Sequence, residues 1–178
     1  MRIIGKRFPG LGEILPVLGA TLFACHGWSL RGFFNELPSF MLYFKFGEIA
    51  TIFAYMMAFA LLESLIVVGG LCLLGALLPP KWLRDGFAYK GFVVVAVGAV
   101  AAVRFQRALR NTYPPVQTLM IYLLVPLAIM AIVIIVAQNA ENIRRVLLDI
   151  SDRFSIMLYV FLPIGLVSLF VVVARNLL

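Results

Sequence analysis

A single acidic residue interrupts a long apolar stretch of the sequence, and its surroundings decide what chemistry it can do. Glu63 stands near the middle of residues 49–78, where it is the only aspartate, glutamate, lysine, arginine or histidine. A helix of that length measures about 45 Å, more than the roughly 30 Å hydrocarbon core of a bilayer. A carboxylate is costly in lipid, so we expect Glu63 to face protein or water, where it could carry a proton or bind a cation. The competing interpretation is that Glu63 bonds to another helix and serves only assembly.

Three arginines follow one another at three-residue spacing near the end of a second apolar segment. Arg104, Arg107 and Arg110 therefore spiral over one side of a helix end, and their simplest role is to bind lipid headgroups. Arg104 has a second possible role. It and Glu63 each lie fifteen residues from an end of the turn between their segments, which places both about 22 Å from that turn in an antiparallel pair. We predict that Glu63 and Arg104 form a buried pair, which could be purely structural.

Groups for catalysis or metal binding are few in this sequence. His26 is the only histidine, which excludes a two-histidine metal site, and we expect it to be a polar residue near a span end. Cys25 and Cys72 lie in apolar stretches without CxxC or metal-ligand spacing. A lipoprotein signal with Cys25 as the lipidated residue is disfavoured because Phe23 is bulky for that motif. No serine nucleophile elbow or phosphate-binding glycine loop occurs, so we predict no catalytic residue, metal or cofactor.

The composition places the chain among integral membrane proteins. Of its 178 residues, 63% are hydrophobic and only 13% are charged, which is too much apolar surface for one aqueous core. The net charge of +7 is spread over the segment ends without a long basic run. That distribution favours anionic phospholipids, and not nucleic acid, as the partner of the basic surface.

We predict an all-α, polytopic helix bundle that forms one domain over residues 1–178. The first apolar segment is short for a span, and Pro16 and its glycines would also allow a re-entrant segment, leaving four spans. We prefer five. The predicted spans are residues 11–30, 49–78, 88–109, 116–137 and 154–174.

Residues 31–48 mix aromatic with charged side chains, a combination typical of the headgroup zone. Pro38 lies inside this range and is expected to break any single helix there. We therefore predict an interfacial segment along the membrane surface that leads into the second span.

Residues 138–153 have the pattern of an amphipathic helix outside the hydrocarbon. Apolar residues recur on one face, while opposite charges lie four residues apart on the other. Such a helix either lies on the membrane surface or docks a partner protein, and the alternating charge leaves both open. The residues predicted for docking are Glu141, Arg145, Asp149 and Arg153.

Basic residues predict the orientation. With five spans, the N-terminal side holds nine against six on the other side, which places the N-terminus in the cytoplasm. With four spans the count is again nine against six, but every later loop changes side. The nine are Arg2, Lys6, Arg7, Lys81, Arg84, Lys90, Arg144, Arg145 and Arg153.

Three functions remain open. We favour a non-enzymatic accessory or structural subunit of a larger membrane complex. The sequence leaves open whether the partner of the chain is another membrane protein or a second copy in a homo-oligomer. The alternative is a small proton- or ion-coupled transporter that uses Glu63 and Arg104 with kinks at Pro126 and Pro163. A lipid-acting enzyme, with the arginines holding a phosphate and His26 or Glu63 as base, has the least support because these groups are scattered.

Overall fold

The computed structural model describes residues 8–80, 82–111 and 115–177, without the side chains of Arg110 and Asn111. The described chain is helical and has no strand. Five of its helical runs are long and apolar enough to cross a membrane, so the expectation of an all-α chain with five long apolar helices is confirmed. The helices are α1 (Leu11–Tyr43), α2 (Phe46–Leu77), α3 (Phe87–Asn111), α4 (Val116–Asn139), α5 (Glu141–Phe154) and α6 (Ile156–Leu177).

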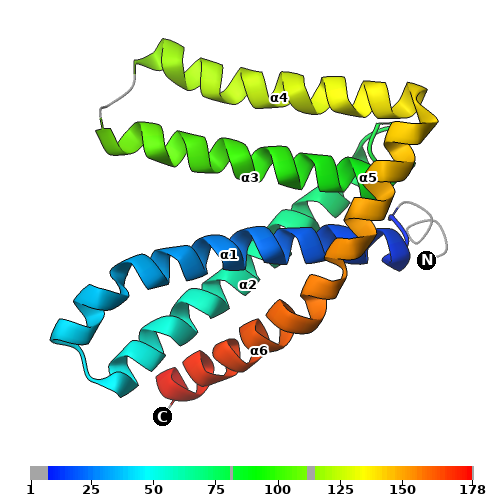
Figure 1. Ribbon diagram of the computed structural model, residues 1–178. Helices are drawn as coiled ribbons and strands as arrows, with labels where there is room; N and C mark the ends of the chain where they lie inside the picture. The colour runs from blue at the N-terminus through cyan, green and yellow to red at the C-terminus, as the bar shows by residue number, and fades with distance from the viewer. Residues whose placement is uncertain (1–7, 81, 112–114, 178) are drawn as a thin grey trace.

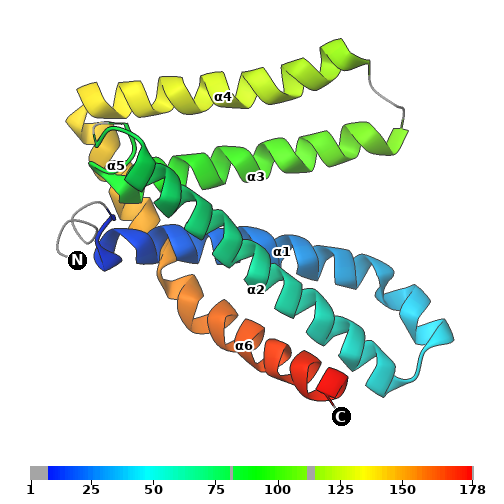
Figure 2. The same cartoon turned by 180° about the vertical axis from the view of Figure 1, so that it is seen from behind.

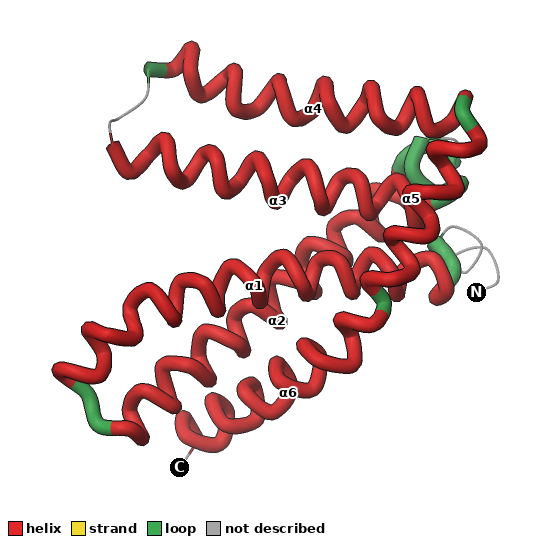
Figure 3. The backbone as a smooth tube through the Cα atoms, viewed as in Figure 1, coloured by secondary structure: helices red, strands yellow, loops and turns green. Residues whose placement is uncertain are grey.

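The helices form a tight group and a diverging hairpin (Figures 1 and 2). α1 packs on α2, α3, α5 and α6, whereas α4 packs on α3 and α5. The pair α3 and α4 splays away from α1, α2 and α6, and α5 crosses the end where the pair begins to diverge (Figure 3). The start of α1, the turn before α3 and α5 gather at that end. The turn between α1 and α2 and the end of α6 lie at the other (Figure 1).

α1 continues well past the range in which the first span was expected to end. Pro38 lies inside this helix and does not break it, so the expectation of a break at Pro38 is wrong. The extension packs on α2, because the buried ring of Phe33 lies 5.1 Å from that of Phe53. Phe40 stacks near Phe33 in turn, at 6.1 Å between centroids. Ring contacts of this kind contribute about 0.5–1.5 kcal/mol each, and they help to hold α1 as a helix around Pro38, which removes one helical hydrogen bond.

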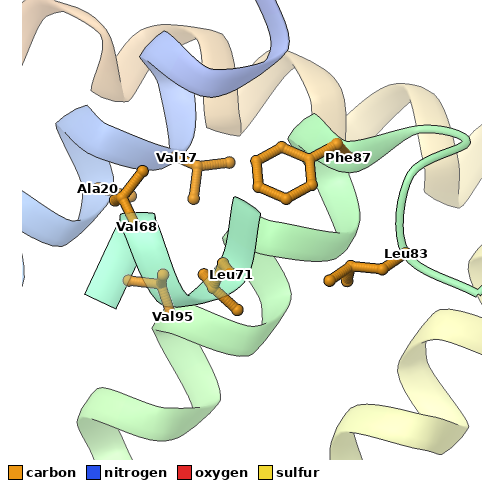
Figure 4. Close-up of a cluster of buried hydrophobic side chains, with 7 residues drawn as sticks. All are labelled: Val17, Ala20, Val68, Leu71, Leu83, Phe87 and Val95. Carbon is orange, nitrogen blue, oxygen red and sulfur yellow. The ribbon is translucent and has the colours of Figure 1, made fainter. Parts of the chain in front are cut away.

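A core of apolar side chains joins α1, α2 and α3 at the end where α5 crosses (Figure 4). The ring of Phe87, at the first position of α3, is fully buried between the other two helices. Leu83 contributes from the turn, so the turn is held by the same cluster. The members are Val17, Ala20, Val68, Leu71, Leu83, Phe87 and Val95.

A second apolar cluster joins α1, α2 and α6 through Leu22, Leu61 and Phe161. Buried hydroxyls beside it are satisfied within their own helices. Thr21 Oγ1 donates to the Val17 carbonyl at 2.7 Å, and Ser64 Oγ donates to the Ala60 carbonyl at 2.7 Å. Such bonds to the carbonyl four residues back allow polar side chains to lie in an apolar interior without partners from another helix.

Glycines stand where helices come closest. A Cβ added at Gly19 of α1 would lie 2.2 Å from the carbonyl oxygen of Phe154, at the junction of α5 and α6. At Gly165 of α6 it would lie 2.9 Å from Leu61 Cβ, and at Gly91 of α3 it would lie 2.8 Å from a Val17 methyl group. A side chain at Gly19 would meet a backbone carbonyl, and one at Gly91 or Gly165 would displace a neighbouring side chain.

The contact at Gly19 gives a stability prediction. Gly19→Ala should destabilise the fold by about 1–3 kcal/mol, the usual cost of overpacking, because a backbone carbonyl cannot change rotamer to make room. The matched control is Gly27→Ala on the same helix, where a Cβ has open space. It should be neutral or stabilising by up to about 1 kcal/mol. The measurement is unfolding of the purified protein by denaturing detergent, and equal midpoints for the two variants would contradict the packing described.

Candidate functional site

Where α3 leaves α1, the two helices enclose a cleft with α2 at its side. The inner part is a cavity of about 630 Å³ between the middle of α1 and the middle of α3. Glu63 reaches it from α2, and small residues line it from α3. The lining is Phe23, Ala24, Cys25, Gly27, Trp28, Ser29, Glu63, Ala99, Ala102, Val103 and Gln106.

The outer part of the cleft is smaller and more polar. It measures about 270 Å³ and shares Trp28 and Gln106 with the inner cavity, so the two are continuous. The Arg31 guanidinium carbon lies 5.4 Å from the centroid of the Trp28 ring, within cation–π range. The lining is Trp28, Arg31, Gly32, Asn35, Gln106 and Arg107. We call the two cavities together the α1–α3 cleft.

The predicted site residues lie at different places around this cleft. Glu63 is exposed and lines the inner cavity, and Arg107 lines the outer one. Arg104 is also exposed and lines neither cavity, although its neighbours Ala102 and Val103 line the inner cavity with Glu63. No ion pair joins Glu63 to Arg104 in the described structure, and their pairing stays a prediction. The side chain of Arg110 lies outside the described residues.

His26 lies in the core and not at a span end as expected. Its side chain is fully buried, and its ring centroid is 5.1 Å from that of Phe161. Nδ1 is 3.0 Å from the Leu22 carbonyl oxygen, which it can satisfy as donor. Nε2 has no hydrogen-bond partner among the described residues and points toward Gly165, whose added Cβ would lie 3.2 Å away. Packing of this kind suits a neutral ring that fixes the contact of α1 with α6.

A second, polar cavity opens at the end of the bundle where α5 crosses. It measures about 590 Å³ and is built from α1, the turn before α3, and the adjoining ends of α3, α4 and α5. We call it the end cavity. Its charged residues were not predicted as a site, because they are far apart in the sequence and belong to no motif. The lining is Glu13, Asp85, Gly86, Tyr89, Lys90, Gln138, Arg144 and Leu148.

Lys90 is the most unusual residue of the end cavity. Only 2% of its surface is exposed, although it stands one turn into α3. Asp85 and Glu13 lie close enough to interact electrostatically with its ammonium group, and Nζ is 5.7 Å from the Tyr89 ring centroid. Gly86 makes the turn possible through a positive φ of 78°. Electrostatic attraction to Lys90 of α3 therefore links Glu13 of α1 and Asp85 of the turn to this helix.

α5 has a buried side, an exposed charged face and an exposed apolar stripe. Ser151 is buried, and its Oγ lies 3.4 Å from the Ala88 carbonyl of α3, to which it donates. The predicted docking residues lie on the exposed, charged face. Among them Arg145 and Glu141 form an ion pair of 2.7 Å, whose high exposure makes it weak. An apolar stripe of Ile143, Val146 and Ile150 also remains exposed.

No protein-family model, curated protein or solved structure matches this chain. Among the described residues, no group of three or more histidine, cysteine or acidic side chains is placed to hold a metal ion. The functional proposals below therefore depend on the α1–α3 cleft, the end cavity and the exposed helix faces.

The end cavity gives a second stability prediction. Lys90→Met should destabilise the protein by about 1 kcal/mol, because it removes the positive charge that attracts the half-buried Glu13 of α1 and the exposed Asp85 of the turn. Asp85→Asn should partly compensate, so a double-mutant cycle should give a coupling energy of about 0.5 kcal/mol. Lys45→Met, at an exposed lysine near the start of α2, is the control and should change little. Additive effects of Lys90→Met and Asp85→Asn would show that the two groups do not interact.

Proposed function

We propose that this chain is a multi-pass integral membrane protein. The support is the quantity of large apolar surface that the long helices leave uncovered, such as Ile66 of α2, Leu123 of α4 and Phe170 of α6. Contiguous apolar surface on this scale is unfavourable in water. In lipid it carries no such penalty, because acyl chains are as apolar as leucine. The end at which α5 crosses faces the cytoplasm, since the N-terminal side carries nine basic residues against six.

Within the membrane, the chain acts as a non-enzymatic accessory subunit that docks through α4. The observation that carries this proposal is the isolation of α4, in which Ala137 is the one buried residue of twenty-four. Its contact with α3 is loose: the Phe105 and Tyr122 rings are 6.0 Å apart, and an apolar groove of about 450 Å³ lies between the helices. A helix held this weakly by its own chain offers most of its surface to a partner's helix. Packing across α4 would bring the van der Waals contact that drives helix association in lipid.

The charged face of α5 extends the same docking surface beyond the membrane. α5 follows α4 directly and packs on it. A partner that covers α4 would therefore reach Glu141 and Arg145, and further along Asp149 and Arg153. The exposed stripe that begins at Ile143 lies in the headgroup layer in this arrangement. A surface role and a docking role for α5 are then compatible.

Ion-coupled transport is the second candidate, and the inner cavity of the α1–α3 cleft favours it. Glu63 faces this cavity together with Cys25, Ser29 and Gln106. A carboxylate beside other polar groups at mid-depth is the usual arrangement for a proton or cation site.

The native mass of the protein, extracted gently from its own membranes, separates these functions. We expect a stoichiometric membrane protein as companion. A photo-crosslinking residue in place of Leu124, exposed on α4, should form an adduct with it. The same residue in place of Val167, equally exposed on α6 but away from α4, is the matched control and should not.

A bare monomer or homo-oligomer would overturn the accessory-subunit proposal. Ion-coupled transport would then take its place, and Glu63→Gln would be assayed first in reconstituted vesicles. Equal adducts from both crosslinking positions would place the partner elsewhere than on α4.

A further inference from the structure

We propose that the α1–α3 cleft binds one anionic phospholipid, with its phosphate between Arg31 and Arg107 and an acyl chain in the inner cavity. This site differs from general attraction of basic residues to headgroups, because it is a cleft lined by α1 and α3, with Glu63 of α2 at its inner part. The inference rests on the membrane placement proposed above, and it names a ligand for a site that neither docking nor assembly requires.

The depth of the two arginines fits a phosphate. Arg31 is twenty residues from the start of α1, and Arg107 is twenty residues from the start of α3. Both helices start at the end where α5 crosses (Figure 1). At 1.5 Å per residue, each arginine lies about 30 Å from that end, which is about the thickness of the hydrocarbon core. The outer cavity therefore opens at the headgroup level of the leaflet away from α5.

The chemistry of the outer cavity also fits. Arg31 and Arg107 line it together with Asn35 and Gln106, and no acidic side chain is among the described residues that line it. Guanidinium groups bind phosphate through paired, charge-assisted hydrogen bonds. Trp28 joins this polar rim to the inner cavity, as tryptophan does where headgroups meet acyl chains.

The inner cavity determines which way the lipid lies. From the rim it continues along Ala99 and Ala102 of α3 and past Phe23 of α1, all apolar surface. Glu63 stands fourteen residues from the end of α2, which places it about 21 Å from the same end of the bundle and about 9 Å deeper than the arginines. Its carboxyl group excludes a second anion from the inner cavity. The anionic group of the lipid therefore stays at Arg31 and Arg107, and the chain enters toward the bilayer centre.

Arg104 supplies the matched control. It has the same charge, lies on α3 one turn before Arg107, and is exposed, but it lines neither cavity. Attraction of headgroups to basic side chains in general would involve Arg104 as much as Arg107. A site in the cleft would not involve it.

Tryptophan fluorescence reports occupancy directly. The chain has two tryptophans, so Trp82→Phe leaves Trp28 as the only one. The Trp82→Phe variant is reconstituted in phosphatidylcholine vesicles that contain a small fraction of phosphatidylglycerol with brominated chains. Bromine atoms quench tryptophan fluorescence on contact. The comparison uses the same fraction of brominated phosphatidylcholine. Circular dichroism and the unfolding midpoint confirm that each variant folds.

We expect brominated phosphatidylglycerol to quench Trp28 at a fraction where brominated phosphatidylcholine does not. Its relative association constant should be about 25-fold higher, from a factor of about five for each of the two arginines. Arg31→Gln with Arg107→Gln should abolish the preference, and Arg104→Gln should leave it intact.

Three results would overturn the proposal. The first is equal quenching of Trp28 by both brominated lipids. The second is an equal loss of the preference for phosphatidylglycerol in the Arg104→Gln and Arg107→Gln proteins. The third is reversal of the quenching by inorganic phosphate, which would mean that the site binds a soluble anion. Quenching by neither lipid would mean that Trp28 does not lie in a bilayer, and the membrane placement itself would fail. Equal quenching by both lipids leaves that placement standing, so the two failures are distinguishable.

Discussion

The fold depends on how closely helix backbones approach one another around α1. Each of three glycines leaves room for atoms of a neighbouring element. Gly19 lies against the carbonyl of Phe154, and Gly91 lies against the side chain of Val17. Gly165 lies against the side chains of Leu61 and His26. In the membrane placement proposed above, apolar side chains gain little from leaving lipid, so the contact area that small residues allow is the main source of helix association. α1 thereby becomes the helix on which α2, α3, α5 and α6 all pack.

The same constraint explains why one side of the molecule is open. α3 meets α1 closely only near its start, at Gly91 and Phe87, and then diverges with α4 beside it (Figures 1 and 4). The α1–α3 cleft results from this divergence. Polar side chains line this cleft and the end cavity, whereas Nε2 of His26 is buried in the core without a partner among the described residues. The close helix contacts and the α1–α3 cleft therefore have one geometric cause.

Much of this architecture was predictable from the sequence, and the exceptions have physical reasons. Apolar run lengths predict the helices, and residue counting puts Glu63 near the level of Ala102 and Val103, with which it shares a cavity. Counting does not predict which face of a helix meets which neighbour, so the other residues that line the cleft with Glu63 were not predicted. Pro38 was expected to break any helix within residues 31–48, but it lies inside α1, where the contact of Phe33 with Phe53 of α2 holds the helix. Burial of Lys90 depends on segments far apart in the chain, for which periodicity gives no signal.

The most direct test of the account is the side of the membrane on which each turn lies. Single cysteines at Gly10, Lys45, Trp82 and Asp149, in a Cys25→Ala and Cys72→Ala background, are labelled with an impermeant maleimide in sealed vesicles of known orientation. If α1 crosses the membrane as one helix, Gly10, Trp82 and Asp149 label from the cytoplasmic face and Lys45 from the opposite face. Labelling of Gly10 and Lys45 from the same face would mean that α1 does not cross, and it would contradict the architecture on which the account depends.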